Sequence, residues 1–577
     1  MEGTESIPIR PPMLLLAALF ALIVLAQGIA APFDKDAEPQ SAQWIVSVVR
    51  DGAWLIPRDY YGAIDRKPPL FYWLAAAVTE ASGGTVDEVR ARIVSLMAGA
   101  ALATIVLAWT AANCGATEGW LAFLFLLGIY GYSSRATLAL TDMLMTLFAM
   151  SAYLAMFPLL NGVESPRRAR WVGIILGLGV LTKGPVVIVL VGLAAAIYLL
   201  MKSENPIPIL RRGWPWKILG VAIGVAAIWY IPWLASGERH VVQVFLKENL
   251  GHFLPEKYGG TGEAARPPWY IAVRTVGGSL PIVMLLPASA AAIATGEIGL
   301  NRRRAFAFQA AFAIATVAFF SMGSAKRDDY ILPAMPPIAI LCAGAFFLDK
   351  PREGTMRWGA RLRDGASAAI GIAMLMLLVA AWIPLGGLRM QSSDAALYSL
   401  FQGMIRSAGL GSLAFIALTV SASATVLIAI WRRNQIAQGV AVGVLAIAGT
   451  LLMTASIRPA LERERTPKPF LALVKARIED APVFLIYARN YELSYYLGRG
   501  IGLLTGRRAA HPPAGRPYYL IAYDRDVSRI PQPIRSRMKQ VARAGTVGGE
   551  GPPTLYEVDP IGSPVAGLNV ERGAANK

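Results

Sequence analysis

The residues with the clearest chemistry lie in a polar stretch, 33–74, that follows the first long apolar segment. Three carboxylates stand at its start, Asp34, Asp36 and Glu38. A lysine, Lys67, precedes two prolines near its end. A carboxylate can take a proton from an attacking hydroxyl, and a lysine held by two prolines can bind a phosphate. The simpler explanations are a helix cap for the acids and an interfacial lysine beside aromatic residues.

Seven further residues stand in short polar motifs between apolar segments. Ionisable groups at such positions are costly in a membrane and commonly face a polar cavity. Each motif also has a simpler explanation: an ion pair within SRATLALTDM (134–143), a hairpin turn at LTKGP (181–185), or pairing with the aspartates of KRDDYILP (326–333). The candidates are Arg135, Asp142, Lys183, Arg266, Lys326, Arg327 and Tyr330.

The composition indicates a polytopic membrane protein. Of 577 residues, 55% are hydrophobic and 16% charged, with a mean hydropathy of +0.48, whereas soluble domains carry about 25% charged residues. The net charge of +18 does not indicate nucleic-acid binding, because the basic residues form short clusters between apolar runs, as topology signals do. Two cysteines and three histidines offer neither a disulfide framework nor a histidine-built zinc site.

Thirteen apolar segments are predicted to span the membrane, two of them short for a full span. They are 13–33, 92–113, 118–134, 138–160, 171–182, 185–201, 216–235, 271–295, 305–322, 330–348, 366–386, 409–431 and 437–456. The first could also be read as a cleaved signal peptide, but its length and the spans that follow favour an uncleaved helix.

Positive charge sets the predicted orientation. If 68–81 is a helix on the outer surface rather than a span, six basic clusters fall on one side, which the positive-inside rule makes cytoplasmic together with the N-terminus. The unusual polar motifs, including the loops 34–91 and 236–270, then share the outer side. We therefore expect an external active site on a membrane domain, 1–457.

The tail, 458–577, is predicted to be a small external α/β domain. A helical pattern at 469–479 alternates with strand-like runs at 483–487, 518–523 and 554–558. Its last dozen residues are expected to be frayed.

Four motifs in this order resemble the bacterial aminoarabinose transferase and protein O-mannosyltransferase group of polytopic glycosyltransferases. They are 52–74, 134–143, 181–185 and 326–333, and the similarity runs from about Asp34 to Pro333. The resemblance implies the C-type glycosyltransferase fold. It also implies transfer of a sugar from a polyprenyl (undecaprenyl) phosphate, on the periplasmic face of the inner membrane, to a lipid, glycan or protein acceptor.

The resemblance also assigns roles to the candidate residues. Lys67 would contact the donor phosphate, assisted by Lys326, Arg327 and Arg266. Asp36 or Glu38 would be the catalytic base of a single displacement that inverts the anomeric centre. The cavity would include Asp34, Arg135, Asp142, Lys183 and Tyr330.

The chain departs from the family pattern in three places. It has Ala37-Glu38 where the family has Asp-Glu, Arg66 where the aminoarabinose branch has glutamate, and no histidine near Arg266. The usual ligands of a divalent cation are therefore not matched, so a divalent cation stays an open alternative and no other cofactor is predicted. The same departures leave the identity of the sugar open, and argue against aminoarabinose. The alternatives are a non-catalytic polyprenyl-lipid-binding protein and a lipid-linked glycan transporter. We expect a monomer embedded in membrane lipid.

Overall fold

The computed structural model describes most of the chain. It covers residues 9–33, 37–64, 67–237, 266–295, 300–323, 325–346, 357–383, 392–406, 409–486, 489–504, 516–544 and 552–559. The predicted site residues Asp34 and Asp36, and nearly all of the predicted loop 236–270, lie outside the described residues.

Contacts divide the chain into two compact units. The membrane unit consists of Met1–Ala30, Val48–Pro57 and Asp65–Pro459, and the C-terminal unit of Ala31–Ser47, Arg58–Ile64 and Ala460–Lys577. The sequence suggested a single division near residue 457, with all of 34–91 in the membrane domain. The contacts instead group two pieces of that loop with the C-terminal unit.

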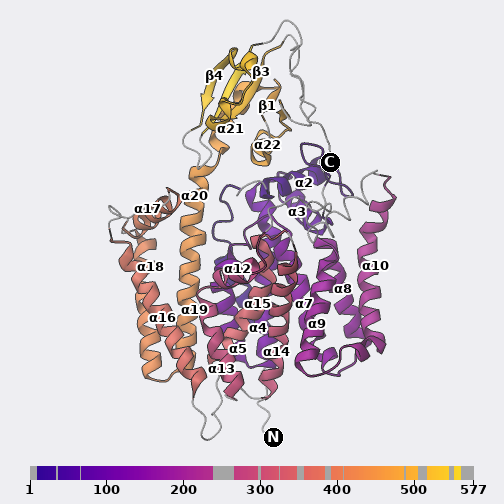
Figure 1. Ribbon diagram of the computed structural model, residues 1–577, viewed down its shortest axis with the longest axis vertical. Helices are drawn as coiled ribbons and strands as arrows, with labels where there is room; N and C mark the ends of the chain where they lie inside the picture. Colours follow the sequence, from indigo (N-terminus) through magenta and orange to yellow (C-terminus); the bar gives the residue numbers. More distant parts are fainter. Residues whose placement is uncertain are drawn as a thin grey trace. The chain divides into compact units, whose positions relative to one another are not determined.

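The membrane unit is built from helices that run side by side (Figure 1). Its first half comprises α1 (Pro11–Leu25), α3 (Leu70–Ala81), α4 (Glu88–Asn113), α5 (Ala116–Gly128), α6 (Tyr130–Ser133), α7 (Asp142–Leu160), α8 (Pro166–Lys183), α9 (Val186–Met201), the 3₁₀-helix η1 (Ile207–Arg211) and α10 (Gly213–Ala235).

The second half begins after the undescribed loop. It comprises α12 (Tyr270–Gly278), η3 (Ile282–Leu285), α13 (Leu286–Thr295), α14 (Leu300–Met322), η4 (Asp328–Ala334), α15 (Met335–Ala343), η5 (Gly344–Phe346), α16 (Trp358–Ala380), α17 (Ser392–Arg406), α18 (Leu410–Trp431), α19 (Gln435–Leu451) and the π-helix η6 (Leu452–Ile457).

Each of the thirteen predicted apolar segments contains a helix, so the polytopic helical architecture is confirmed. Among the described residues, however, eight helices are long and apolar enough to cross a membrane, or up to nine if a bent pair is one span. The count of thirteen is therefore not confirmed. Several of the remaining apolar helices are short: α1 has 15 residues and α5 has 13, whereas a full crossing needs about 20.

One predicted span is wrong as a continuous helix. The segment 271–295 divides into Tyr270–Gly278 and Ile282–Thr295, which meet at 96°. The apolar composition predicted the membrane location, but the break falls at Ser279-Leu280-Pro281, after two glycines. Proline cannot continue a helix of this kind without losing a backbone hydrogen bond.

Glycines allow α8 and α10 to pack closely. A Cβ atom at Gly177 would lie 2.6 Å from Cβ of Val225 and 2.9 Å from the carbonyl oxygen of Ala222, and Gly173, one turn earlier, is equally close to Val221. Small residues four apart are the usual means of close helix contact in membranes, where burial of apolar surface supplies little driving force.

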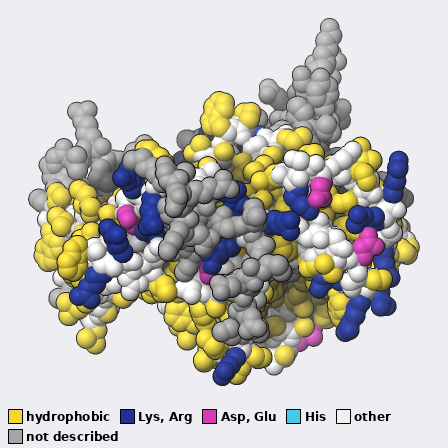
Figure 2. All heavy atoms as spheres, turned by 90° about the horizontal axis from the view of Figure 1, so that it is seen from below, with side chains coloured by type: hydrophobic (Ala, Val, Ile, Leu, Met, Phe, Trp, Pro, Cys, Tyr) yellow, Lys and Arg dark blue, Asp and Glu magenta, His cyan; other side chains and the backbone are white. Residues whose placement is uncertain are grey.

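Basic side chains gather at one end of the membrane unit. Figure 2 views the molecule from below Figure 1 and shows Lys and Arg in several patches on this face, with few Asp or Glu. Some of these charges are paired between loops: Arg212, before α10, lies 3.2 Å from Glu164, before α8.

The C-terminal unit contains a mixed five-stranded sheet of order β2-β1-β3-β5-β4. Its described elements are α2 (Ala37–Asp51, of which Ala37–Ser47 belongs here), α20 (Arg458–Arg465, from Ala460), α21 (Lys468–Ile478), β1 (Val483–Leu485), α22 (Tyr491–Leu497), β2 (Gly502–Leu503), β3 (Tyr518–Tyr523), α23 (Asp524–Val527), α24 (Gln532–Arg535), β4 (Met538–Arg543) and β5 (Pro553–Val558).

The sheet is covered on both faces. The β1 strand is parallel to β2 and β3, while β5 is antiparallel to β3 and β4. One face packs on α21 and α22 and the other on Ile530 and Ile534, because successive strand residues point to opposite faces. The predicted small α/β domain with a helix near 469–479 is confirmed, and β2 and β4 are additional strands.

We expect Gly177→Ala to lower the stability of the membrane unit by about 1–3 kcal/mol, because the added methyl must push against the fixed Ala222 carbonyl. The measurement is the apparent unfolding free energy in detergent. Gly192→Ala is the control, since nothing lies within 4 Å of a Cβ placed there. Equal stability of the two variants would show that the α8–α10 contact tolerates separation.

Candidate active site

A buried ion pair joins the ends of two helices. Asp142 is the first residue of α7 and Lys183 the last of α8, and the Lys183 ammonium donates to the Asp142 carboxylate. The two side chains are only 9% and 13% exposed, so each charge depends on the other for compensation. The same ammonium lies 5.1 Å from the ring centroid of Tyr330, within cation–π range.

Two more cations act on this pair. Lys67, which precedes α3, and Arg327, which precedes η4, both lie close enough to the Asp142 carboxylate to interact with it electrostatically. The structure therefore brings together four of the predicted residues, Lys67, Asp142, Lys183 and Arg327, from segments more than 250 residues apart.

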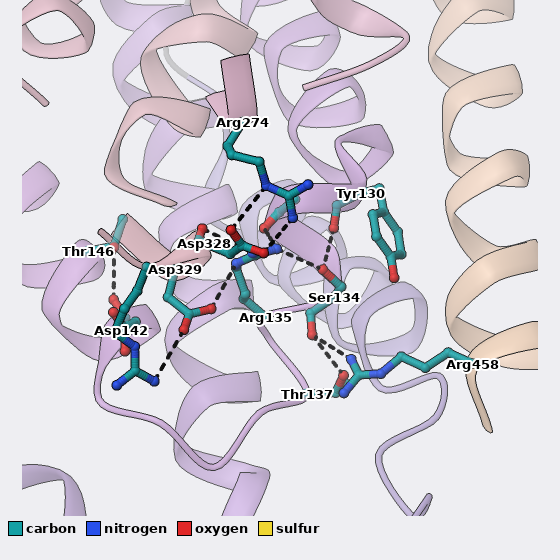
Figure 3. A network of polar contacts seen from close by, with 12 residues as sticks. Tyr130, Ser134, Arg135, Thr137, Asp142, Thr146, Arg274, Asp328, Asp329 and Arg458 are labelled. Atoms are coloured by element: carbon teal, nitrogen blue, oxygen red, sulfur yellow. Dashed lines mark hydrogen bonds and ion pairs between the residues drawn. The ribbon is translucent and has the colours of Figure 1, made fainter. Parts of the chain in front are cut away.

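The tandem aspartates of η4 bind a second set of cations (Figure 3). Arg135 lies 3.3 Å from Asp329 through Nε and donates to the Asp328 carbonyl at 3.1 Å, and Arg327 lies 3.8 Å from Asp329. The interpretation that Arg135 and Asp142 pair with each other is wrong. Each pairs with a residue of another segment.

The α12 helix supplies two polar side chains on one face, four residues apart. Arg274 donates from two nitrogens to the Asp328 carboxylate, and the Tyr270 hydroxyl also donates to it. Arg266 donates to the Tyr270 hydroxyl, and its guanidinium lies 4.5 Å from the centroid of that ring. The predicted Arg266 thus joins the cluster through Tyr270.

Lys326 has a different setting from the other predicted cations. Its side chain is buried, and its ammonium donates to two backbone carbonyls, Gly323 at 2.6 Å and Arg266 at 2.9 Å. These bonds hold Arg266, four residues before the start of α12, against the end of α14. With two of three N–H donors used in this way, Lys326 fixes the chain around the cluster and has one donor left.

The cluster has more positive than negative charge. Among the described residues it contains seven cations and three carboxylates. An excess of fixed N–H donors at the ends of apolar helices suits an anion with several oxygens, such as a phosphate. Within the described part of the chain, no three His, Cys, Asp or Glu residues group as metal ligands.

Of the three carboxylates predicted at the start of the stretch 33–74, the structure describes Glu38, while Asp34 and Asp36 lie outside the described residues. Glu38 lies in the first turn of α2, in the C-terminal unit, and its side chain is buried. A carboxylate in the first turn of a helix is stabilised by the positive end of the helix dipole.

Sequence reasoning missed Tyr270 and Arg274 and treated Asp328 and Asp329 only as partners of their neighbours. One available signal was the polar pair four residues apart, Tyr270 and Arg274, at the edge of an apolar segment, since residues at this spacing share a helix face.

Comparison with known sequences points in one direction. A family described as dolichyl-phosphate-mannose-protein mannosyltransferase matches residues 66–233. An undecaprenyl phosphate-α-4-amino-4-deoxy-L-arabinose arabinosyl transferase of Shewanella sediminis is 24% identical over 368 residues, 63% of this chain and 65% of that protein. The Pseudomonas aeruginosa protein of the same name (strain UCBPP-PA14) is 26% identical over 394 residues, 65% of each chain. The matches thus cover just under two thirds of these relatives.

Solved structures show the fold. The crystal structure of ArnT from Cupriavidus metallidurans bound to undecaprenyl phosphate aligns with a TM-score of 0.69 at 18% identity, over 95% of this chain and 98% of that one. Its apo form gives 0.71 at 17% identity, over 95% and 97%. The chain therefore has the C-type glycosyltransferase fold, and the predicted resemblance is confirmed.

The buried pair Asp142–Lys183 and the partly exposed pair Arg274–Asp328 should differ in coupling free energy, the part of the stability that depends on both partners being present. We expect Asp142→Asn or Lys183→Met alone to cost about 3–5 kcal/mol, because each leaves a buried charge unpaired, and the double variant to recover part of that loss. The matched cycle uses Arg274→Gln and Asp328→Asn, whose side chains are 49% and 41% exposed, and should give a coupling of about 0.2–1 kcal/mol. Denaturant unfolding in detergent measures both. Equal coupling would contradict the difference in burial.

Proposed function

We propose that this multi-pass membrane protein is a glycosyltransferase of the bacterial inner membrane. It takes a sugar from a polyprenyl phosphate of the undecaprenyl type and passes it to an envelope lipid, glycan or protein. The observation that carries the proposal is the cation-rich cluster of Lys67, Arg327, Lys183 and Arg135 at the ends of apolar helices. A lipid-linked phosphate would bring its anionic group to that level of the membrane.

The cluster suits the departing phosphate better than a neutral ligand. When the bond between the sugar C1 and the phosphate oxygen breaks, negative charge grows on that oxygen, and preorganised cations stabilise it. Lys67 is the proposed primary contact, with Arg327 beside it. Lys183 and Arg135 already share carboxylates, and Arg266 and Lys326 hold the surrounding chain.

The acceptor side of the reaction needs a base if the nucleophile is a hydroxyl. The acceptor oxygen attacks C1 from the face opposite the phosphate, its proton passes to a carboxylate, and the polyprenyl phosphate leaves with the bonding electrons. One displacement inverts C1. We assign the base to Asp36 or Glu38. An acceptor that is itself a phosphate would need the carboxylate only for orientation.

The named relatives support an arabinosyl-type donor, but the substrate is broader in this proposal. The relatives' names specify 4-amino-4-deoxy-L-arabinose. Here Arg66 stands where that branch carries glutamate, so we leave the sugar as a hexose or pentose. The positive patches of Figure 2 support a cytoplasmic N-terminus under the positive-inside rule. A periplasmic C-terminal unit is part of the same proposal and rests on the basic clusters of the sequence. We propose a monomer.

We expect Lys67→Ala to reduce transfer by about 100-fold or more, because the leaving phosphate loses a fixed cation. The assay uses proteoliposomes with radiolabelled polyprenyl-phospho-sugars and follows label into lipid and protein fractions. Lys217→Ala, at an exposed position near the start of α10, is the control and should keep wild-type transfer. Full transfer by Lys67→Ala would remove Lys67 from the phosphate site.

We expect one of Asp36→Asn and Glu38→Gln to lower transfer by about 10²–10⁴-fold, the usual effect of losing a general base. Binding of undecaprenyl phosphate should be unchanged in both, because Lys67 and Arg327 are intact. If both variants transfer at the wild-type rate, the base is not in this segment. If the wild type binds the donor but neither transfers nor hydrolyses it, the non-catalytic alternative is the better description.

A further inference from the structure

Within the C-terminal unit, a buried amide bonds α2 both to α22 and to the turn 58–64. Gln43 lies in α2, and none of its surface is exposed. Its Nε2 donates to the Tyr491 carbonyl and to the Ser494 hydroxyl, both at 2.9 Å, and its Oε1 accepts from the Tyr60 backbone N–H at 3.0 Å. Both N–H donors and the oxygen are therefore used, by two segments: α22 and the turn that contains Tyr60.

The turn 58–64 holds one face of α2. Gln40 donates to the Asp59 carboxylate at 3.3 Å, and Ser47 accepts from the Arg58 backbone N–H at 3.1 Å. Together with Gln43 these residues have the spacing of one helix face. The turn is itself fixed, because the Asp59 carboxylate accepts from the backbone N–H groups of Tyr61 and Ala63, both at 2.9 Å.

Residues in α22 and just before it also contact the chain before α2 and the turn 58–64. The Phe33 backbone N–H, just before the acidic residues, donates to the Tyr496 hydroxyl at 3.3 Å, and the rings of Phe33 and Tyr495 meet edge to face with centroids 5.1 Å apart. Tyr61 of the turn donates to the Asn490 carbonyl at 3.1 Å. Burial raises the pKa of Tyr61 to about 12, so this hydroxyl keeps its proton at neutral pH.

The backbones of the turn and of the C-terminal unit also approach closely. A Cβ atom at Gly500 would lie 2.3 Å from the Tyr60 carbonyl oxygen. The turn, α2 and the region after α22 are thus packed with little room for one to shift without the others.

We infer that Gln43 is a positioning residue for the transfer reaction: by tying α2 to Tyr60, Tyr491 and Ser494 it sets where the Glu38 carboxylate, in the first turn of α2, stands. This inference depends on the proposed function. A helix is rigid over one or two turns, so the rotation imposed at Gln43 is transmitted to Glu38, five residues earlier.

The side chain at position 43 must be a neutral amide of this length. Leucine can neither donate nor accept, and glutamate cannot donate to the Tyr491 carbonyl. A displacement of the base by about 1 Å is enough to cost 10²-fold in rate. Binding of the polyprenyl phosphate depends on Lys67 and its neighbours and should not change.

The test compares full-length Gln43→Leu, Gln43→Glu and Ser494→Ala with Gln540→Leu in proteoliposomes. Gln540 is an exposed residue of β4 and serves as the matched control. Three quantities are measured: kcat and KM for a radiolabelled polyprenyl-phospho-sugar, the affinity for undecaprenyl phosphate, and hydrogen exchange of residues 37–51, 58–64 and 491–497. Ser494→Ala removes one of the three bonds and remains informative if the position-43 variants do not fold.

We expect kcat to fall by about 100-fold in both position-43 variants and less in Ser494→Ala, with KM for the donor and phosphate affinity unchanged. Exchange should rise together in the three segments, and Gln540→Leu should match wild type. Wild-type kcat in Gln43→Leu, or in Ser494→Ala if Gln43→Leu does not fold, overturns this inference alone. A loss of phosphate affinity equal to the loss of kcat also overturns it. A wild-type protein that transfers no sugar overturns the proposed function and the inference together.

Discussion

The arrangement at the ends of the membrane helices depends on the electrostatic compensation of charges that are withdrawn from water. Asp142 begins one apolar helix and Lys183 ends another, and both are almost fully buried, so removing either leaves a buried charge without its direct partner. The same requirement brings Arg135 to Asp329, which lies 194 positions later in the chain. Packing of the helices and pairing of the charges therefore specify each other.

The positive charge of this cluster is only partly compensated by its carboxylates. The carboxylates of Asp142, Asp328 and Asp329 are shared among a larger number of guanidinium and ammonium groups. A site of this kind is held in place by its own ion pairs and still has positive potential for a ligand. Lys326 contributes through its two bonds to carbonyls, which fix the chain from which Arg266 projects.

The sequence predicts the helices well because apolar runs and basic clusters are local signals. It fails at 271–295, where composition alone does not show that Gly277, Gly278 and Pro281 interrupt the helix. The sequence also did not predict the short strand β2 and the polar strand β4, since neither carries a clear alternation of apolar and polar residues. For the site, the sequence identified the residue types but not their partners. Arg135 and Asp142 lie in one motif, 134–143, yet Arg135 pairs with a residue of η4 and Asp142 with a residue of α8. Only the folded chain supplies those contacts.

The crossing of the chain between the two units has a consequence for synthesis. Ala31–Ser47 and Arg58–Ile64 belong to a unit whose other part starts at Ala460, so Gln43 is made long before Tyr491 and Ser494. At translation rates of 5–20 residues per second, the interval is roughly 20–90 s. Throughout that time α2 has been synthesised, but the two α22 groups that bond the Gln43 amide in the folded protein have not. Residues that follow Ala460 therefore complete the first loop, and a ribosome that stops before them leaves α2 without its partners even though the membrane helices have been made.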